Sequence, residues 1–125
     1  MYKIDTDKDN KLIYIELSGQ IQCDELQNYI NELINLVSQF GKNEVMILAT
    51  VERQDPFAQC CIPLLVECYC KIWGNIKKVA YVQKRVVTRM QVDRIVKEVN
   101  NLSGGLLAVR TFSTRKEALK FLNEG

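Results

Sequence analysis

The sequence predicts an α/β protein with a single-layer mixed β-sheet of about five strands and four helices, in the order β-β-α-β-α-β-α-β-α. Two observations carry this prediction: two alternating segments open the chain, and short apolar runs then alternate with longer segments of helical periodicity. Strands that alternate with helices pair in parallel through right-handed crossovers, so most of the sheet is expected to be parallel. A length of 125 residues predicts one domain, residues 1–125, whose core needs no disulfide or metal.

An antiparallel hairpin is expected at the start of the chain. Residues 1–7 (MYKIDTD) and 11–19 (KLIYIELSG) alternate apolar and polar side chains, as half-buried strands do. The residues DKDN between them supply the polar turn, and Gly19 ends the second strand.

The first helix is predicted to begin at Asp24, a good N-cap whose reciprocal partner would be Gln27. Gly41 is expected to end this helix in the left-handed conformation. The apolar stripe recurs at spacings of four and three, as on an amphipathic helix: Leu26, Ile30, Leu33, Val37 and Phe40.

The run EVMILAT (44–50) is continuous and apolar, which is typical of a strand buried on both faces. Residues 57–73 then have helical periodicity. Pro63 suits only the first turn of a helix, so the residues FAQCC before Ile62 are expected to be irregular or to form a separate turn.

The second half of the chain repeats the strand–helix alternation. Gly74 and Asn75 stop the middle helix, and IKKVAYV (76–82) is the next strand. Thr88 is predicted to cap the third helix, and NLSGG ends it.

The chain closes with the last strand and helix. LLAVRTF (106–112) is predicted to form the strand. Thr114 and Glu117 are spaced as a capping box for the closing helix.

Four of the five cysteines lie within residues 60–70, which raises the question of a metal or redox centre. Cys61 and Cys68 are separated by about 10.5 Å along a helix, too far to share one ion, and no C-x-x-C spacing occurs. We therefore predict small, buried, reduced side chains, and an inert Cys23. A metal, redox or intermolecular role stays open as the alternative, because Cys60 lies in the irregular segment.

The absence of histidine excludes Ser-His-Asp and Cys-His nucleophiles and the commonest zinc sites. No catalytic residue, cofactor or metal ligand is therefore predicted, and the protein is expected not to be an enzyme. The net charge of +2 is too low, and basic–aromatic interleaving too scarce, to predict nucleic-acid binding. The polar N-terminus and the lack of a long apolar run predict a cytoplasmic protein without integral membrane contact.

The segments NIKKVAYV (75–82) and VRTFSTRKEALKFL (109–122), together with the order of elements, resemble the SpoIIAA-like family of bacterial proteins with the STAS-type fold. The resemblance spans essentially the whole chain. It implies a four- or five-stranded mixed sheet with helices packed against it, and a small regulatory or ligand-binding protein.

The anti-sigma-factor antagonists of that family carry a phosphorylated serine after the third strand. Here no serine occurs between Gln39 and Leu102, and Thr50 at the strand end is the hydroxyl nearest to that place. We interpret Thr50 as a β-forming residue first, and expect no serine phospho-switch.

The predicted function is a cytoplasmic binding or regulatory module, since ligands of open α/β sheets gather at the carboxyl ends of the strands. The occupant would be a protein partner, a small anion held by basic groups at a helix start, or a lipophilic molecule beside the aromatic residues near the middle helix. The candidate binding residues are Thr50, Arg53, Phe57, Lys84, Arg85 and Arg89. The alternative is a self-associating protein with no small ligand, with a homodimer as the default.

Overall fold

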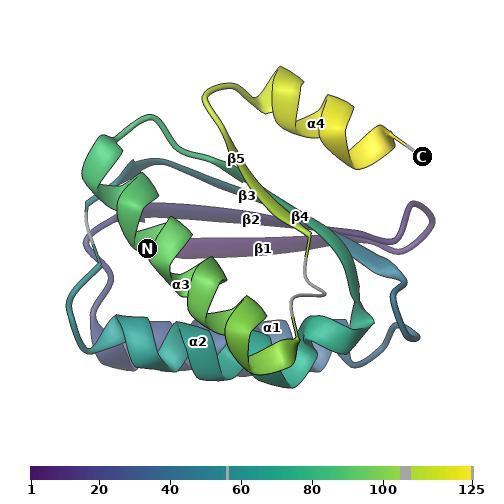
Figure 1. Ribbon diagram of the computed structural model, residues 1–125, viewed down its shortest axis with the longest axis horizontal. Helices are drawn as coiled ribbons and strands as arrows, with labels where there is room; N and C mark the ends of the chain where they lie inside the picture. Colours follow the sequence, from purple (N-terminus) through teal and green to yellow (C-terminus); the bar gives the residue numbers. More distant parts are fainter. Residues whose placement is uncertain (56, 105–107, 125) are drawn as a thin grey trace.

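The computed structural model describes residues 1–55, 57–104 and 108–124, and the side chains of all of these except residues 52–54. The chain forms a five-stranded sheet with four helices (Figure 1). The elements are β1 (Tyr2–Asp7), β2 (Leu12–Gly19), α1 (Cys23–Val37), β3 (Val45–Gln54), α2 (Cys61–Ile72), a 3₁₀ turn (Trp73–Asn75), β4 (Ile76–Val82), α3 (Val86–Ser103), β5 (Val109–Phe112) and α4 (Arg115–Asn123).

The strands lie in the sheet in sequence order, and this arrangement confirms the predicted mixed fold. β1 pairs antiparallel with β2, whereas β2–β3, β3–β4 and β4–β5 are all parallel. The hairpin turn is closed by the side-chain amide of Asn10, which donates to Asp7 at 2.8 Å. This hydrogen bond lowers the pKa of the Asp7 carboxyl.

Helices cover both faces of the sheet. α1, α2 and α3 lie on one face, where they enclose the larger core, and α4 lies alone on the other (Figure 1). β3 shows why two cores form, because successive side chains of a strand point to opposite faces. Ile47 and Ala49 enter the larger core, and Leu48 enters the smaller one beneath α4.

Three predicted helix ends are confirmed. Pro63 stands in the first turn of α2, where its missing N–H removes no helical hydrogen bond. α3 ends at Gly104, whose φ of 86° is left-handed. Thr114 caps α4 by accepting the Glu117 N–H at 3.3 Å. Residues 106 and 107 of the last predicted strand lie outside the described residues.

Both predicted ends of α1 are wrong. The helix begins one residue before Asp24, whose carboxylate accepts the backbone N–H of its neighbour Glu25 and therefore caps nothing. It ends at Val37 rather than Gly41, because the following turn is closed by Phe40 N–H donating to the Val37 carbonyl at 3.0 Å.

Thr88 does not cap α3. The helix already begins at Val86, and Thr88 is fully buried within its first turn. Its hydroxyl has no hydrogen-bond partner among the described residues. The chain enters the helix earlier than predicted because the connection from β4 is only three residues long.

No helix in the described part of the chain is both long and apolar enough to cross a lipid bilayer.

Three buried tyrosines on the α1–α3 side of the sheet predict a cooperative alkaline transition. Burial raises the pKa of Tyr81 to about 12 and the pKa of Tyr29 and Tyr69 well above the usual value. The folded state therefore keeps protons that an unfolded chain releases near pH ~10. This contribution to stability is complete below pH ~10 and is lost as the pH rises toward about 12.

An absorbance titration of phenolate formation tests this expectation. We expect these three of the five tyrosines to ionise only in one step that coincides with the loss of far-ultraviolet circular dichroism. Ionisation of more than two tyrosines while the dichroism is unchanged would contradict the described core.

Candidate functional site

The candidate site lies at the edge of the sheet where the parallel strands β2, β3 and β4 end. A helix that follows each parallel strand runs back along the sheet, so the N-terminal ends of α1, α2 and α3 gather at this edge. The residues between β3 and α2 cross it. We call residues 55 and 57–60 the β3–α2 segment.

Asp55 fixes the first part of this segment. Its backbone N–H donates to the carbonyl of Gly19 at the end of β2, at 3.1 Å. Its carboxylate pairs with the guanidinium of Arg85 at 2.8 Å, and both side chains are half-exposed. Because exposed ion pairs contribute at most about 1 kcal/mol, this pair orients the segment more than it stabilises the fold.

Gln91 holds the middle of the segment through both ends of its amide. The Phe57 N–H donates to Gln91 Oε1 at 2.8 Å, and Gln91 Nε2 donates to the Phe57 carbonyl at 3.0 Å. The Phe57 ring is itself buried in the larger core. The segment is therefore attached to α3 by two hydrogen bonds and to the core by one ring.

Gln83, which follows β4, is fully buried and joins three elements. Its Nε2 donates to the Val51 carbonyl of β3 at 2.6 Å, and its Oε1 accepts the Arg85 N–H at 2.8 Å. Its backbone N–H donates to the Phe112 carbonyl of β5 at 3.0 Å. The sequence analysis identified neither Gln83 nor Gln91 as a site residue. For Gln83, the one available signal was a polar residue directly after an apolar strand.

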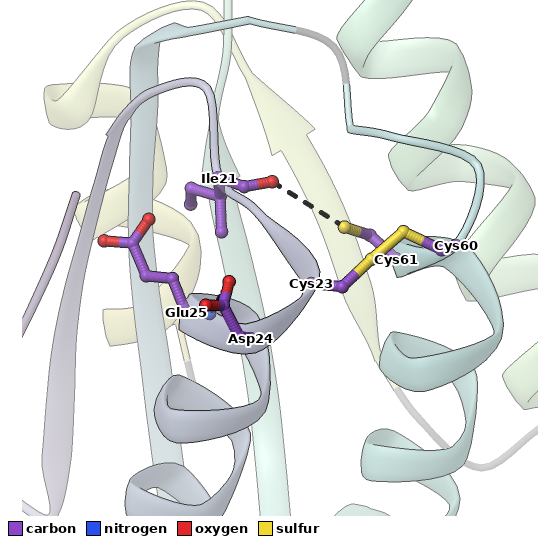
Figure 2. The surroundings of a disulfide bond; sticks show 6 residues. All are labelled: Ile21, Cys23, Asp24, Glu25, Cys60 and Cys61. Carbon is purple, nitrogen blue, oxygen red and sulfur yellow. Dashed lines mark hydrogen bonds between the residues drawn. A yellow bond between two sulfur atoms is a disulfide. The ribbon is translucent and has the colours of Figure 1, made fainter.

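Cys60 and Cys23 form a disulfide that joins the end of the β3–α2 segment to the start of α1 (Figure 2). The expectation of reduced cysteines, with an inert Cys23, is therefore wrong for this pair. The physical reason is topological: α1 and α2 start side by side, so residues that are 37 positions apart meet. Cys61 lies next to the bond, and its thiol donates to the Ile21 carbonyl at 3.8 Å (Figure 2).

Two other cysteines behave as the sequence predicts. Cys61 and Cys68 are buried members of the larger core, and burial raises the pKa of both thiols, that of Cys68 to about 12. With this pKa, the Cys68 thiol is protonated at neutral pH and unreactive. Cys70 is free and half-buried.

The predicted basic residues converge in part. Lys84 and Arg85 are exposed in the connection from β4 to α3, and Arg89 is half-buried one turn into α3. Arg85 is neutralised by Asp55, whereas Lys84 and Arg89 have no ion pair among the residues that the structure describes.

The other predicted residues do not join one pocket. Thr50 faces the opposite side of the sheet, where it lines a hollow of about 330 Å³ with Tyr14 and Arg115. Phe57 is core rather than surface. Arg53 belongs to β3, but its side chain lies outside the described residues.

The expected apolar pocket near the middle helix is small. Phe57 and Tyr69 line a cavity of only about 20 Å³, which is room for one water molecule. Trp73 is not among the residues that line it.

An exposed apolar patch that the sequence analysis missed lies on the first turns of α3. Val86, Val87 and Met90 expose 70%, 58% and 65% of their surfaces. We call these three residues the α3 patch. The opposite, buried face of α3 contains Val92, Ile95 and Val99.

Comparison with known proteins gives a fold. No protein-family model matches the chain, and no curated protein matches it. An uncharacterised protein of the DUF3478 family from Shewanella loihica PV-4, with a SpoIIAA-like fold, superposes with a TM-score of 0.71 at 14% identity, covering 98% of this chain and 92% of that one.

Two anti-sigma factor antagonists are also similar. An antagonist from Mycobacterium paratuberculosis gives a TM-score of 0.68 at 11% identity over 99% of this chain and 94% of that one. SpoIIAA in its unphosphorylated form gives 0.66 at 12% identity over 98% and 96%. The likeness extends over the full sheet and all four helices, so this chain has the SpoIIAA-like, STAS-type fold.

Proposed function

We propose that this chain is a single-domain, non-enzymatic regulatory module of the cytoplasm that binds a protein partner through the α3 patch. The observation that carries the proposal is the clustering of three large exposed apolar side chains at the edge of the sheet where the helices begin. Exposed apolar groups that cluster beside polar residues are typical of interaction surfaces. Two of the similar structures are named as antagonists of anti-sigma factors, which supports a partner-binding role.

The surroundings of the α3 patch favour a partner with carboxylates around an apolar centre. Lys84 precedes the patch in sequence and Arg89 lies between Val87 and Met90, and the free N–H groups at the start of α3 add partial positive charge. Complementary charge of this kind speeds association and sets orientation.

The same features favour a protein over a small ligand. The apolar cavity lined by Phe57 and Tyr69, where a lipophilic ligand was expected, holds only about 20 Å³ and is too small for a lipid chain. Arg85, one of the basic residues expected to hold a small anion, already binds Asp55 at 2.8 Å. A small anion bound by Lys84 and Arg89 is the alternative occupant of this site.

A regulatory role without chemistry agrees with the composition. The chain holds no histidine, and no serine occurs between Gln39 and Leu102 for a phospho-switch after β3. We propose that regulation acts through partner binding alone. Self-association through the α3 patch is the alternative function, and site-specific cross-linking separates the two.

The experiment places a photoreactive phenylalanine at Val87 and, as a control, at Lys120 on α4, which covers the opposite face of the sheet. We expect one defined partner to be cross-linked in cells at Val87 and not at Lys120, because only the first position lies in the α3 patch. The measurement is quantitative mass spectrometry of the cross-linked products.

Matched variants sharpen the result. The triple variant Val86→Gln, Val87→Gln, Met90→Gln is expected to lower the yield of the partner cross-link at least tenfold. Because Val87 is itself replaced, the photoreactive phenylalanine is placed at a position next to the α3 patch in this comparison. Leu102→Gln, which changes an equally exposed residue in the last turn of the same helix, is expected to preserve it. A cross-link between two copies of this chain would establish self-association instead. Equal yields at Val87 and Lys120 would overturn the proposal.

A further inference from the structure

Three sulfur atoms meet at the start of α1 and α2. The ligand atoms of Cys23, Cys60 and Cys61 all lie within 4.8 Å of one another. Cys23 is the first residue of α1, Cys60 immediately precedes α2, and Cys61 begins it. A disulfide uses only two of these sulfurs, so Cys61 keeps a thiol beside the bond.

The arrangement of the helices keeps the three residues together independently of the disulfide. β2 and β3 are neighbouring parallel strands, and the helices that follow them pack side by side on one face. Cys61 is buried, and its thiol is directed toward the Ile21 carbonyl (Figure 2). Reduction of the bond therefore leaves three thiols close together on two packed helices.

We infer that, once the Cys23–Cys60 bond is reduced, the three thiols form a binding site for a soft metal ion such as Zn²⁺. Sulfur atoms bound to one zinc ion at ~2.3 Å lie about 3.8 Å apart. The three sulfurs lie within 4.8 Å of one another while the disulfide is closed, so small side-chain movements after reduction would bring them to this spacing. The sequence predicted no metal ligand because that prediction rested on the spacing of the cysteines within α2. It did not include Cys23, which lies on α1.

The chemistry of the site fits a thiophilic ion. Thiolates select zinc or copper(I) over calcium or magnesium. Cys60 is exposed and Cys23 half-buried, so an ion has access from solvent, and water completes the coordination.

The reaction balances in two steps. A phosphine transfers two electrons to the disulfide, water supplies the oxygen and the two protons, and the products are two thiols and the phosphine oxide. Binding of Zn²⁺ then releases the three thiol protons to solvent. The oxidised chain retains one thiol of the three and is expected not to bind zinc at this place.

The test is a competition titration of Zn²⁺ with a chromophoric chelator, using the full chain after phosphine reduction. We expect one zinc ion per reduced chain and none per oxidised chain. Cys61→Ser is expected to weaken binding at least 100-fold, and Cys60→Ser, which alters an exposed side chain, provides a second variant. Cys70→Ser changes a free cysteine of the same helix outside the cluster and is expected to bind as the unmodified chain does.

Cobalt(II) supplies an independent readout, because thiolate ligation produces sulfur-to-metal charge-transfer absorption. This band is expected in the reduced chain and in Cys70→Ser, and is expected to weaken in both cluster variants, with far-ultraviolet dichroism monitoring the fold. Zinc affinity that stays within tenfold in both cluster variants, or that falls in Cys70→Ser, would overturn the inference. So would the absence of stoichiometric binding by the reduced chain.

Discussion

Reduction of the Cys23–Cys60 disulfide is expected to lower the free energy of unfolding by about 4 kcal/mol at 25 °C. The bond closes a loop with a sequence separation of 37, and the chain-entropy relation gives about this value for a loop of that length. Because the bond restricts mainly the unfolded chain, the reduced protein is expected to keep its fold with a lower urea midpoint. Urea unfolding with and without phosphine, in the presence of a chelator to remove metal, measures the difference.

Variants separate the bond from the reductant. The double variant Cys23→Ser, Cys60→Ser is expected to have the stability of the reduced chain under both conditions. Cys70→Ser is expected to respond to reductant as the unmodified chain does, since Cys70 is a free cysteine. A reductant effect below about 1 kcal/mol would mean that the chain does not gain the loop-closure stabilisation expected here.

Gln83→Leu is expected to destabilise the fold by about 3 kcal/mol. The change removes the donor to the Val51 carbonyl and the acceptor of the Arg85 N–H, both at a fully buried side chain. Each buried polar group left unpaired costs about 1–3 kcal/mol, and leucine supplies no replacement. Chemical denaturation followed by circular dichroism measures the loss.

An exposed glutamine is the matched control. Gln39→Leu makes the same chemical change at an exposed residue and is expected to alter stability by less than about 0.5 kcal/mol. Gln83→Glu tests the hydrogen bonds separately, because it keeps the shape of the side chain but removes the donor to the Val51 carbonyl. If Gln83→Leu is as stable as Gln39→Leu, the buried hydrogen bonds described here do not form.

The elements of the fold were predictable because their signals are local. Alternation marked the hairpin, a continuous apolar run marked β3, and the pair Thr114–Glu117 marked the start of α4. Helix starts were less predictable. Asp24 and Thr88 are good capping residues, but the end of the preceding strand and the packing of the helix placed both of them inside the first turn.

The contacts of the site were not predictable in the same way, because they join residues far apart in the chain. Cys23 and Cys60 meet only when β2 and β3 pair in parallel, and Gln91 reaches Phe57 across 34 positions. Periodicity within α2 correctly placed Cys61 and Cys68 in the core. The periodicity of α2 gives no information about Cys23, because Cys23 lies on α1.

The most direct test of this account is the pairing of the cysteines in protein isolated without reductant and alkylated before digestion. We expect a peptide that links Cys23 to Cys60, with alkylated thiols at Cys61, Cys68 and Cys70. The Cys61→Ala variant is expected to give the same link, which distinguishes Cys60 from its neighbour. A bond from Cys23 to Cys68 or Cys70 would contradict the described packing of α1 against α2.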